Sequence, residues 1–293
     1  MGGPAQQDFL PAPRRILGGI AASSAIGALA YRRGSLSRGG VAGAVLTGTT
    51  IFAGGGVVPA SLLVTFFVSS SALSHWRKGH KAAAAVVEAE KGARRDLAQT
   101  LANGGVAALL VLVGCAYPAT PWFPALIGAL ATTNADTWAT EIGLLHRRAP
   151  RLITTGRTVP PGTSGGISPL GTGAAAAGAA LIGVVAVVGQ RLTGVRAGWV
   201  FPLGLLAGLG GSFADSLLGA TVQARYHCPQ CGVATERAVH RCGTPTVLVG
   251  GFRAIDNDAV NFVASACGAA IGWFWGRAIA RRRHGVDPVP IVG

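Results

Sequence analysis

Apolar residues gather along this chain in long runs, separated by short segments rich in arginine and lysine. Each run is about 20 residues long, the length with which an α-helix crosses about 30 Å of hydrocarbon. The pattern predicts about eight membrane-spanning helices, within a range of seven to nine because the early runs are short. The runs are Ile16–Tyr31, Val41–Gly55, Val57–Trp76, Leu101–Tyr117, Phe123–Leu145, Ile167–Gly189, Gly198–Gln223 and Val260–Ala280.

The expected fold class is therefore all-α, a polytopic transmembrane helical bundle that forms a single domain over residues 1–293. Composition agrees, because 12% of the residues are charged and the mean hydropathy is +0.47, whereas a soluble domain carries about 25% charged residues. The first run follows Arg14 and Arg15 and ends in "GALAY", which also resembles a signal-peptide cleavage site. We prefer an uncleaved helix, since so many spans follow it.

The formal net charge of +14 raises the question of a nucleic-acid partner. However, the basic residues lie between the apolar runs and form no single patch with aromatic residues, so we expect no nucleic acid. Loops 32–40, 77–99, 147–166 and 224–255 hold 17 of the 25 lysines and arginines, which predicts that these loops are cytoplasmic. Arginines 277 and 281–283 fit this topology poorly, because they fall on the other side.

Acidic residues, which are rare in this chain, recur near the cytoplasmic ends of the predicted spans. Asp136 and Glu141 lie in "NADTWATEIG", Asp215 in "GGSFADSLLGATVQ" and Asp256 in "DNDAVNF". A carboxylate at membrane depth is costly and usually marks a functional site or a pair. With Asn103, we expect Asp136, Glu141 and Asp215 to be catalytic, and Asp136, Asp215 and Asp256 to bind Mg²⁺. The alternative is structural: each acid caps a helix, as Asp256 could before "AVNF", or pairs with an arginine.

Further amides and hydroxyls accompany these acids at the same face. They are Thr137, Ser216, Asn257 and Asn261. The segments "ADTWATEIG" and "ADSLLGATV" also resemble each other. An internal repeat would place Asp136 and Asp215 around one axis, although a match this short also arises by chance.

A glycine-rich loop, "TTGRTVPPGTSGGISPLGTG", runs into the sixth predicted span. Its backbone amides, the following helix N-terminus and Arg157, Thr163 and Ser164 could bind a phosphate. It lacks the ending of a Walker A motif, and a flexible connector is the alternative. In the loop at 77–99, Lys78, Lys81, Arg94 and Arg95 could reach a phosphate at the mouth of the site, or could simply be solvated.

The loop "HCPQCGVATERAVHRCG" carries four soft ligands, Cys228, Cys231, His240 and Cys242. Such a set suits a structural, tetrahedral Zn²⁺, and a reducing cytoplasm disfavours a disulfide. The spacing is not that of a standard zinc finger, so unligated thiols in a turn are the alternative.

The motifs "TLANGG", "NADTWATEIG", "PPGTSGGIS", "GGSFADSLLGATVQ" and "DNDAVNF" occur in this order. Over about residues 35–280 the chain resembles the membrane family of plant phytyl-phosphate kinase and animal transmembrane protein 19. The resemblance implies a kinase that uses CTP to convert phytyl monophosphate to the diphosphate. The polar positions that it implies are Asn103, Asp136, Thr137, Glu141, Gly162, Thr163, Gly165, Gly166, Asp215, Ser216, Gln223, Asp256, Asn257 and Asn261.

Two functions fit these features. The first is a membrane kinase for an isoprenoid monophosphate, with a nucleoside triphosphate and Mg²⁺ as partners and its site facing the cytoplasm. The second is a transporter or flippase for a phospholipid or ion, which also uses acids at membrane depth. A kinase needs its acids at the nucleotide-accessible face, whereas a transporter needs them reachable from both sides. A CDP-alcohol transferase is excluded because its aspartate pattern is absent, and a homo-oligomer is compatible with either function.

Overall fold

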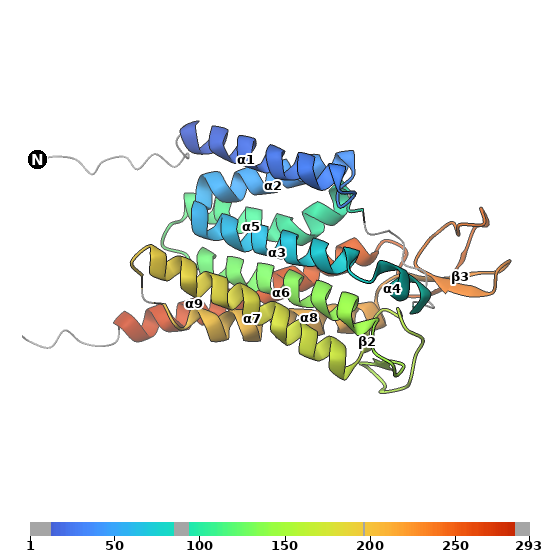
Figure 1. Ribbon diagram of the computed structural model, residues 1–293. Helices are drawn as coiled ribbons and strands as arrows, with labels where there is room; N and C mark the ends of the chain where they lie inside the picture. The colour runs from blue at the N-terminus through green and yellow to red at the C-terminus, as the bar shows by residue number, and fades with distance from the viewer. Residues whose placement is uncertain (1–12, 85–93, 196, 285–293) are drawn as a thin grey trace, which may run out of the picture.

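The computed structural model describes residues 13–84, 94–195 and 197–284. This part of the chain contains long helices that lie side by side with their axes roughly aligned (Figure 1). They are α1 Pro13–Arg32, α2 Arg38–Gly55, α3 Val57–His75, α5 Leu97–Ala116, α6 Trp122–Gly143, α7 Pro169–Leu192, α8 Val200–Thr221 and α9 Asn257–His284. A short helix, α4 Lys78–Ala84, follows α3.

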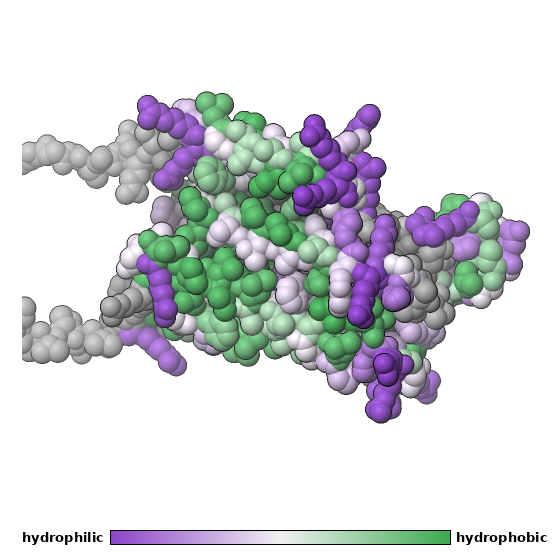
Figure 2. Space-filling view, viewed as in Figure 1, coloured by the Kyte–Doolittle hydropathy of each residue, from purple (hydrophilic) through white to green (hydrophobic). Residues whose placement is uncertain are grey.

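Each of the eight predicted runs thus falls on a long helix. Among the described residues, 5 helices are long and apolar enough to cross a membrane: α3, α5, α7, α8 and α9. Figure 2 shows hydrophobic residues along the middle of one face of the bundle and hydrophilic residues at its two ends. The protein is therefore a polytopic helical membrane protein, while the count of eight spans stays a prediction.

Polar side chains begin several of these helices at one end of the bundle. Ser37 accepts a hydrogen bond from the backbone of Gly40 at the start of α2, and Ser168 accepts one from Gly171 in α7. Asp96 and Gln99 form a capping box at the start of α5, which satisfies two backbone donors reciprocally. These caps extend the helices beyond the apolar runs and place their first turns next to the polar loops.

Helix α6 is the centre of the bundle and packs against α3, α5, α7, α8 and α9. Its residues 124–135 are all buried. Small residues let the neighbours approach closely: a Cβ on Gly128 would lie 2.1 Å from the carbonyl oxygen of Gly268 in α9. Within this core, Asn134 donates to the Gly178 carbonyl and accepts from Ser69, so the buried amide is satisfied. The next residues of α6 reach the polar end of the bundle.

Two small antiparallel sheets lie in the loops at this same end (Figure 1). Strands β1 (Arg151–Leu152) and β2 (Gly166–Ile167) form one. Strands β3 (Arg225–Cys228), β4 (Val233–Thr235) and β5 (Val247–Gly250) form the other, in the order β4-β3-β5. The all-α expectation is correct for the bundle but wrong for these loops, where the valines of β4 and β5 favour strands. Residues 85–93 of the predicted loop 77–99 lie outside the described residues.

The two ends of the bundle differ in character. The start of α1 and the end of α9 lie at the end opposite the sheets (Figure 1). The arginine-rich loops are at the sheet end, whereas Arg277 and Arg281 belong to the last turns of α9. This arrangement is the one expected for an even number of membrane crossings.

We predict that the sheet end faces the cytoplasm. Thr158, in the loop between β1 and β2, and Ala119, between α5 and α6, are both exposed and lie at opposite ends. Thr158→Cys should react with an impermeant thiol reagent only after cells are permeabilised, whereas Ala119→Cys should react in intact cells. Peptide mass mapping must assign the label, because Cys231 and Cys242 are also exposed. Labelling of residue 158 in intact cells would reverse the topology.

Candidate functional site

A cavity of about 300 Å³ opens among the helices and loops at the sheet end. Its walls come from α6, α7, α8, the start of α9, the glycine-rich loop and the segment that follows β4. The structure brings together here many of the residues singled out in the sequence. Those that line the cavity are Asp136, Gly162, Thr163, Ser164, Gly165, Gly166, Asp215, Ser216, Gln223 and Asn257.

Asp136 in α6 and Asp215 in α8 form the centre of this cavity wall. The two helices run in the same direction, and the two carboxyl groups are close enough to interact with each other. Among the described residues, Asp215 Oδ2 is buried and has no hydrogen-bond partner. Two adjacent carboxylates repel each other unless a proton or a cation lies between them, and a buried acceptor without a partner costs free energy. The pair therefore fits a hard divalent cation such as Mg²⁺.

Two further acids, Glu236 and Asp258, also line the cavity. Four of the 11 acidic residues of a strongly basic chain thus face one space. His146 and Arg148 line it as well, and Arg148 brings positive charge to its rim. The sequence interpretation missed Glu236, His146 and Arg148, since they lie in loops without a recognisable motif. The one signal for Glu236 is that it is the single acid of a basic loop.

Asp256 takes a different place from the one expected. Its Oδ1 accepts a hydrogen bond of 2.8 Å from the backbone of Ala259, so Asp256 caps the start of α9. It does not line the cavity, whereas Asp258, two residues later, does. Asp256 thus lies outside the lining that Asp136 and Asp215 share, and its Oδ1 takes part in helix capping. Its role as a Mg²⁺ ligand stays a prediction.

The glycine-rich loop is held tightly against α8. Gly165 has a φ of +80°, and a Cβ there would lie 2.5 Å from the Cβ of Ala220 and 2.6 Å from the Ser216 carbonyl oxygen. Only glycine meets both requirements without strain. Helix α7 begins directly after this loop, so its free backbone N–H groups and partial positive charge face the same region.

Gln223 connects this loop to the segment after β4. Its side chain is 2% exposed, and its Nε2 donates to Ser164 Oγ at 3.0 Å and to Glu236 Oε1 at 2.8 Å. Ser164 Oγ also donates to Glu236 Oε1. Three segments far apart in the sequence therefore meet at one hydrogen-bonded group beside the acid pair.

We predict that Gly165→Ala abolishes most of the activity that this cavity supports, because the loop would have to move away from α8. Gly156→Ala is the matched control: its φ is +67°, but a Cβ there meets no atom within 4 Å. Both variants carry the cost of a left-handed alanine, about 1 kcal/mol. Only Gly165→Ala should weaken binding of the nucleoside triphosphate that the sequence predicts as a partner, measured by isothermal titration. Equal affinities in the two variants would show that the close approach is unimportant.

Several expected residues lie elsewhere. Glu141 forms an ion pair with Lys81 and accepts a hydrogen bond from Ser74, away from the cavity. Lys78 and Arg157 are exposed. Arg94 lies 4.7 Å over the Tyr31 ring and donates to the Leu36 carbonyl. The residues outside the cavity lining are Lys78, Lys81, Arg94, Arg95, Asn103, Thr137, Glu141, Arg157, Asp256 and Asn261.

A second, smaller cavity of about 80 Å³ lies between α1, α2, α3 and α5. Its lining is mostly apolar, but Arg95 and Asn103 lie at it, and Gln99 lines both cavities. The Arg95 guanidinium lies 5.6 Å from the Phe66 ring centroid and donates to Ser71 Oγ at 3.4 Å. The sequence predicted Arg95 and Asn103 near the acids, but both line this smaller, mostly apolar cavity.

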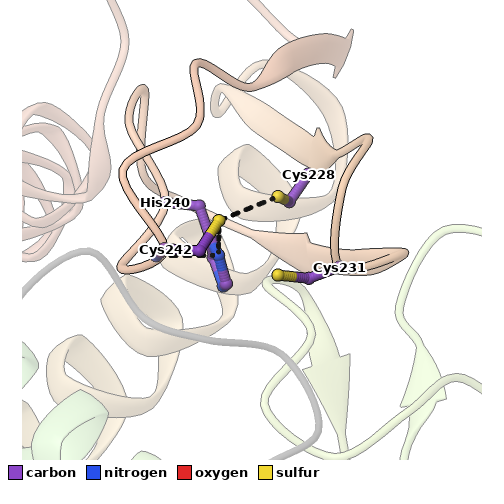
Figure 3. A group of neighbouring side chains, drawn as sticks. All are labelled: Cys228, Cys231, His240 and Cys242. Carbon is purple, nitrogen blue, oxygen red and sulfur yellow. Dashed lines mark hydrogen bonds between the residues drawn. The ribbon is translucent and has the colours of Figure 1, made fainter.

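The four predicted zinc ligands are clustered. Figure 3 shows Cys242 hydrogen-bonded to both Cys228 and His240, with Cys231 beside them. All four ligand atoms lie within 4.8 Å of one another. Hydrogen bonding with Thr244, and then with His240, lowers the pKa of the Cys242 thiol to about 6. Hydrogen bonding with Cys242 raises the pKa of the Cys231 thiol to about 11.

Comparison with known proteins gives a consistent family. The model described as "Integral membrane protein DUF92" matches residues 21–269. Protein PGR of Arabidopsis thaliana is 33% identical over 272 residues, which cover 85% of this chain and 92% of that protein. The chloroplastic protein VTE6 of the same plant is 27% identical over 244 residues, 80% of this chain and 64% of VTE6.

An uncharacterized membrane protein of Methanocaldococcus jannaschii is 39% identical over 129 residues, 43% of this chain and 50% of that protein. No solved structure matches the chain. The family resemblance that the motifs carry is confirmed: this chain belongs to the DUF92 family of integral membrane proteins.

Proposed function

We propose that the protein is a membrane kinase that transfers the terminal phosphoryl group of a nucleoside triphosphate, CTP by the family resemblance, to an isoprenoid monophosphate. The observation that carries this proposal is one cavity in which the Asp136–Asp215 pair faces a glycine-rich loop at a helix N-terminus. Phosphoryl transfer needs these two things together, metal-binding acids and phosphate-binding donors.

Asp136 and Asp215 would hold Mg²⁺, with Asp258 close enough in the same cavity to contribute. The ion supplies charge neutralisation for the phosphates. Ser164, Thr163 and the backbone N–H groups of the glycine-rich loop would orient the nucleotide phosphates. The acceptor is itself an anionic phosphate, so alignment and charge stabilisation carry the rate and no strong general base is needed.

The smaller cavity fits the acceptor. Its apolar walls suit an isoprenoid chain, and Arg95 supplies a cation for a phosphate. Gln99 lines both cavities, so a phosphate beside Gln99 would lie between the chain-binding space and the acids. The substrate would thus be a lipid monophosphate such as phytyl or geranylgeranyl monophosphate, held in the bilayer with its headgroup at the cytoplasmic face.

The experiment is a transfer assay on purified protein. Nucleotides labelled in the terminal phosphate, CTP or ATP, are incubated with phytyl or geranylgeranyl monophosphate, and the lipids are separated by chromatography. We expect labelled isoprenoid diphosphate that requires Mg²⁺, and none with phytol, which lacks the acceptor phosphate. Absence of labelled lipid with every acceptor, together with nucleotide-independent movement of lipid phosphate across proteoliposomes, would favour the transporter instead.

A further inference from the structure

The segment from β3 to β5 has little apolar core of its own. Cys228 and Thr235 are 0% and 1% exposed, but Val233, Val239, Val247 and Val249 are exposed. A segment this small cannot bury enough surface to fix its fold, and natural modules of this size use a metal or disulfides. Its three cysteines are all free thiols in the structure, so none of them forms a disulfide.

Two tight turns present the four candidate ligands. Cys228 and Cys231 flank the turn between β3 and β4, where Gly232 has a φ of +67° and donates to the Cys228 carbonyl. His240 and Cys242 lie on a second turn, where Gly243 has a φ of +87° and donates to the His240 carbonyl. Each turn thus closes on a glycine that directs a pair of ligands inward.

One distance in the cluster matches a tetrahedral site. A zinc ion about 2.3 Å from each sulfur separates two thiolates by about 3.8 Å, and Cys228 Sγ lies 3.7 Å from Cys242 Sγ. His240 Nδ1 lies 3.1 Å from Cys242 Sγ, so this ring nitrogen faces the centre of the group. Three thiolates and one imidazole are a usual donor set of structural zinc, and four protein ligands leave no position for substrate.

The four candidate ligands also lie on both sides of Glu236 in the sequence, and Glu236 lines the larger cavity. Glu236 follows β4, between Cys231 and His240 in the sequence, and its Oε1 accepts from Ser164 of the glycine-rich loop and from Gln223. Two backbone hydrogen bonds close the base of the segment. The N–H of Ala224 donates to the Ile255 carbonyl at 2.8 Å, and the N–H of Phe252 donates to the Val222 carbonyl at 2.9 Å. The backbone that carries Glu236 lies between this base and the ligands, directly after the pairing of Thr235 with Tyr226.

We propose that Cys228, Cys231, His240 and Cys242 bind a structural Zn²⁺, and that this zinc holds Glu236 in place to anchor the glycine-rich loop beside the acid pair. The anchoring role rests on the proposed function only in that the loop binds phosphate; zinc binding does not. Glu236 is a positioning residue, since its bonds go to Ser164 and Gln223.

The metal is tested on the purified full chain by elemental analysis and X-ray absorption. We expect about one zinc per chain, with sulfur neighbours at about 2.3 Å, and tetrahedral thiolate spectra after replacement by cobalt. Cys231→Ser and Cys242→Ser should lose the metal, whereas Cys267→Ser, in α9, should keep it. Protein without metal, or with iron in place of zinc, would overturn the site.

The anchoring role is tested by hydrogen exchange without nucleotide or lipid, so that its result is independent of kinase activity. Zinc-free protein should exchange faster in residues 225–250 and also in 161–168, while α6 stays protected. Glu236→Ala should reproduce the faster exchange of 161–168 with zinc retained. Val239→Ala, in the same segment and exposed, should change neither. Unchanged exchange of 161–168 in Glu236→Ala would overturn the anchoring role and leave the zinc result standing.

Discussion

Asp136→Asn and Asp215→Asn should fold and insert normally, yet transfer phosphoryl groups at least about 100-fold more slowly than the wild type. The structural reason is that the two carboxyl groups are in contact and Asp215 Oδ2 has no hydrogen-bond partner among the described residues. A neutral amide is less costly than a carboxylate at membrane depth, so the helices should remain stable. The charge that strengthens metal binding in the transition state is lost.

The measurement is single-turnover transfer at several Mg²⁺ concentrations, on variants shown to be folded by thermal melts. Asp256→Asn is the matched control, because Asp256 caps α9 outside the cavity lining and asparagine is an equally good cap. It should keep nearly the wild-type rate. Wild-type rates in both Asp136→Asn and Asp215→Asn would mean that the pair is structural.

The second large effect concerns the Lys81–Glu141 pair. Lys81 is deeply buried, with its side chain 6% exposed against 21% for Glu141, and its Nζ also donates to the Leu73 carbonyl. The pair thus ties α4 to α3 and α6. Glu141→Gln leaves a buried ammonium without its counter-charge, which should cost up to about 3 kcal/mol of unfolding free energy, the lower part of the range for buried pairs.

A double-mutant cycle measures this coupling. Lys81→Met alone should also destabilise, whereas the combined Lys81→Met/Glu141→Gln variant should recover much of the loss, because no unpaired charge remains. Thermal melts in detergent give the stabilities, and transfer rates are taken per folded molecule. We expect those rates to stay within a few-fold of the wild type. A large fall in rate for Glu141→Gln at unchanged stability would restore the catalytic role expected from its sequence motif.

The helices of the bundle could be predicted closely from the sequence, because a lipid bilayer requires a spanning segment to be helical and sets the length of its apolar run. The predicted run Val57–Trp76 became α3, Val57–His75. The start of α5 was placed at Leu101, whereas the helix begins at Leu97. Its first turn is polar and is capped by Asp96, so a hydropathy pattern cannot detect it.

The contact between Asp136 and Asp215 could be expected from two helices that run in one direction and carry similar segments. Glu141 shows the limit of such an argument. Five residues turn an α-helix by roughly 140° beyond one full turn, so Glu141 faces α3 and α4 while Asp136 faces α8. The depth of a side chain in the membrane can be estimated from topology, whereas the side of the helix from which it points depends on how the helices pack.

Glu236 could not be found from the sequence for a related reason. It is 72 residues from Ser164 along the chain, and it reaches the cavity through strand pairing that sets Cys228 opposite Val233. Two turns with left-handed glycines, Gly232 and Gly243, lie in this segment, and neither is part of a hydrophobic pattern. A few turn residues and ligands determine the structure of such loops, and hydrophobic periodicity does not detect them.

One measurement tests directly whether the Asp136–Asp215 pair holds a divalent ion against the phosphates of a nucleotide, as we propose. Purified protein is loaded with Mn²⁺ and a non-hydrolysable CTP analogue, and phosphorus hyperfine coupling to the manganese is recorded by electron-nuclear double resonance. We predict a clear phosphorus coupling in the wild type and in Asp256→Asn, and its loss in the Asp136→Asn/Asp215→Asn double variant. A coupling that persists unchanged in the double variant, or is absent from the wild type, would contradict metal binding by this pair.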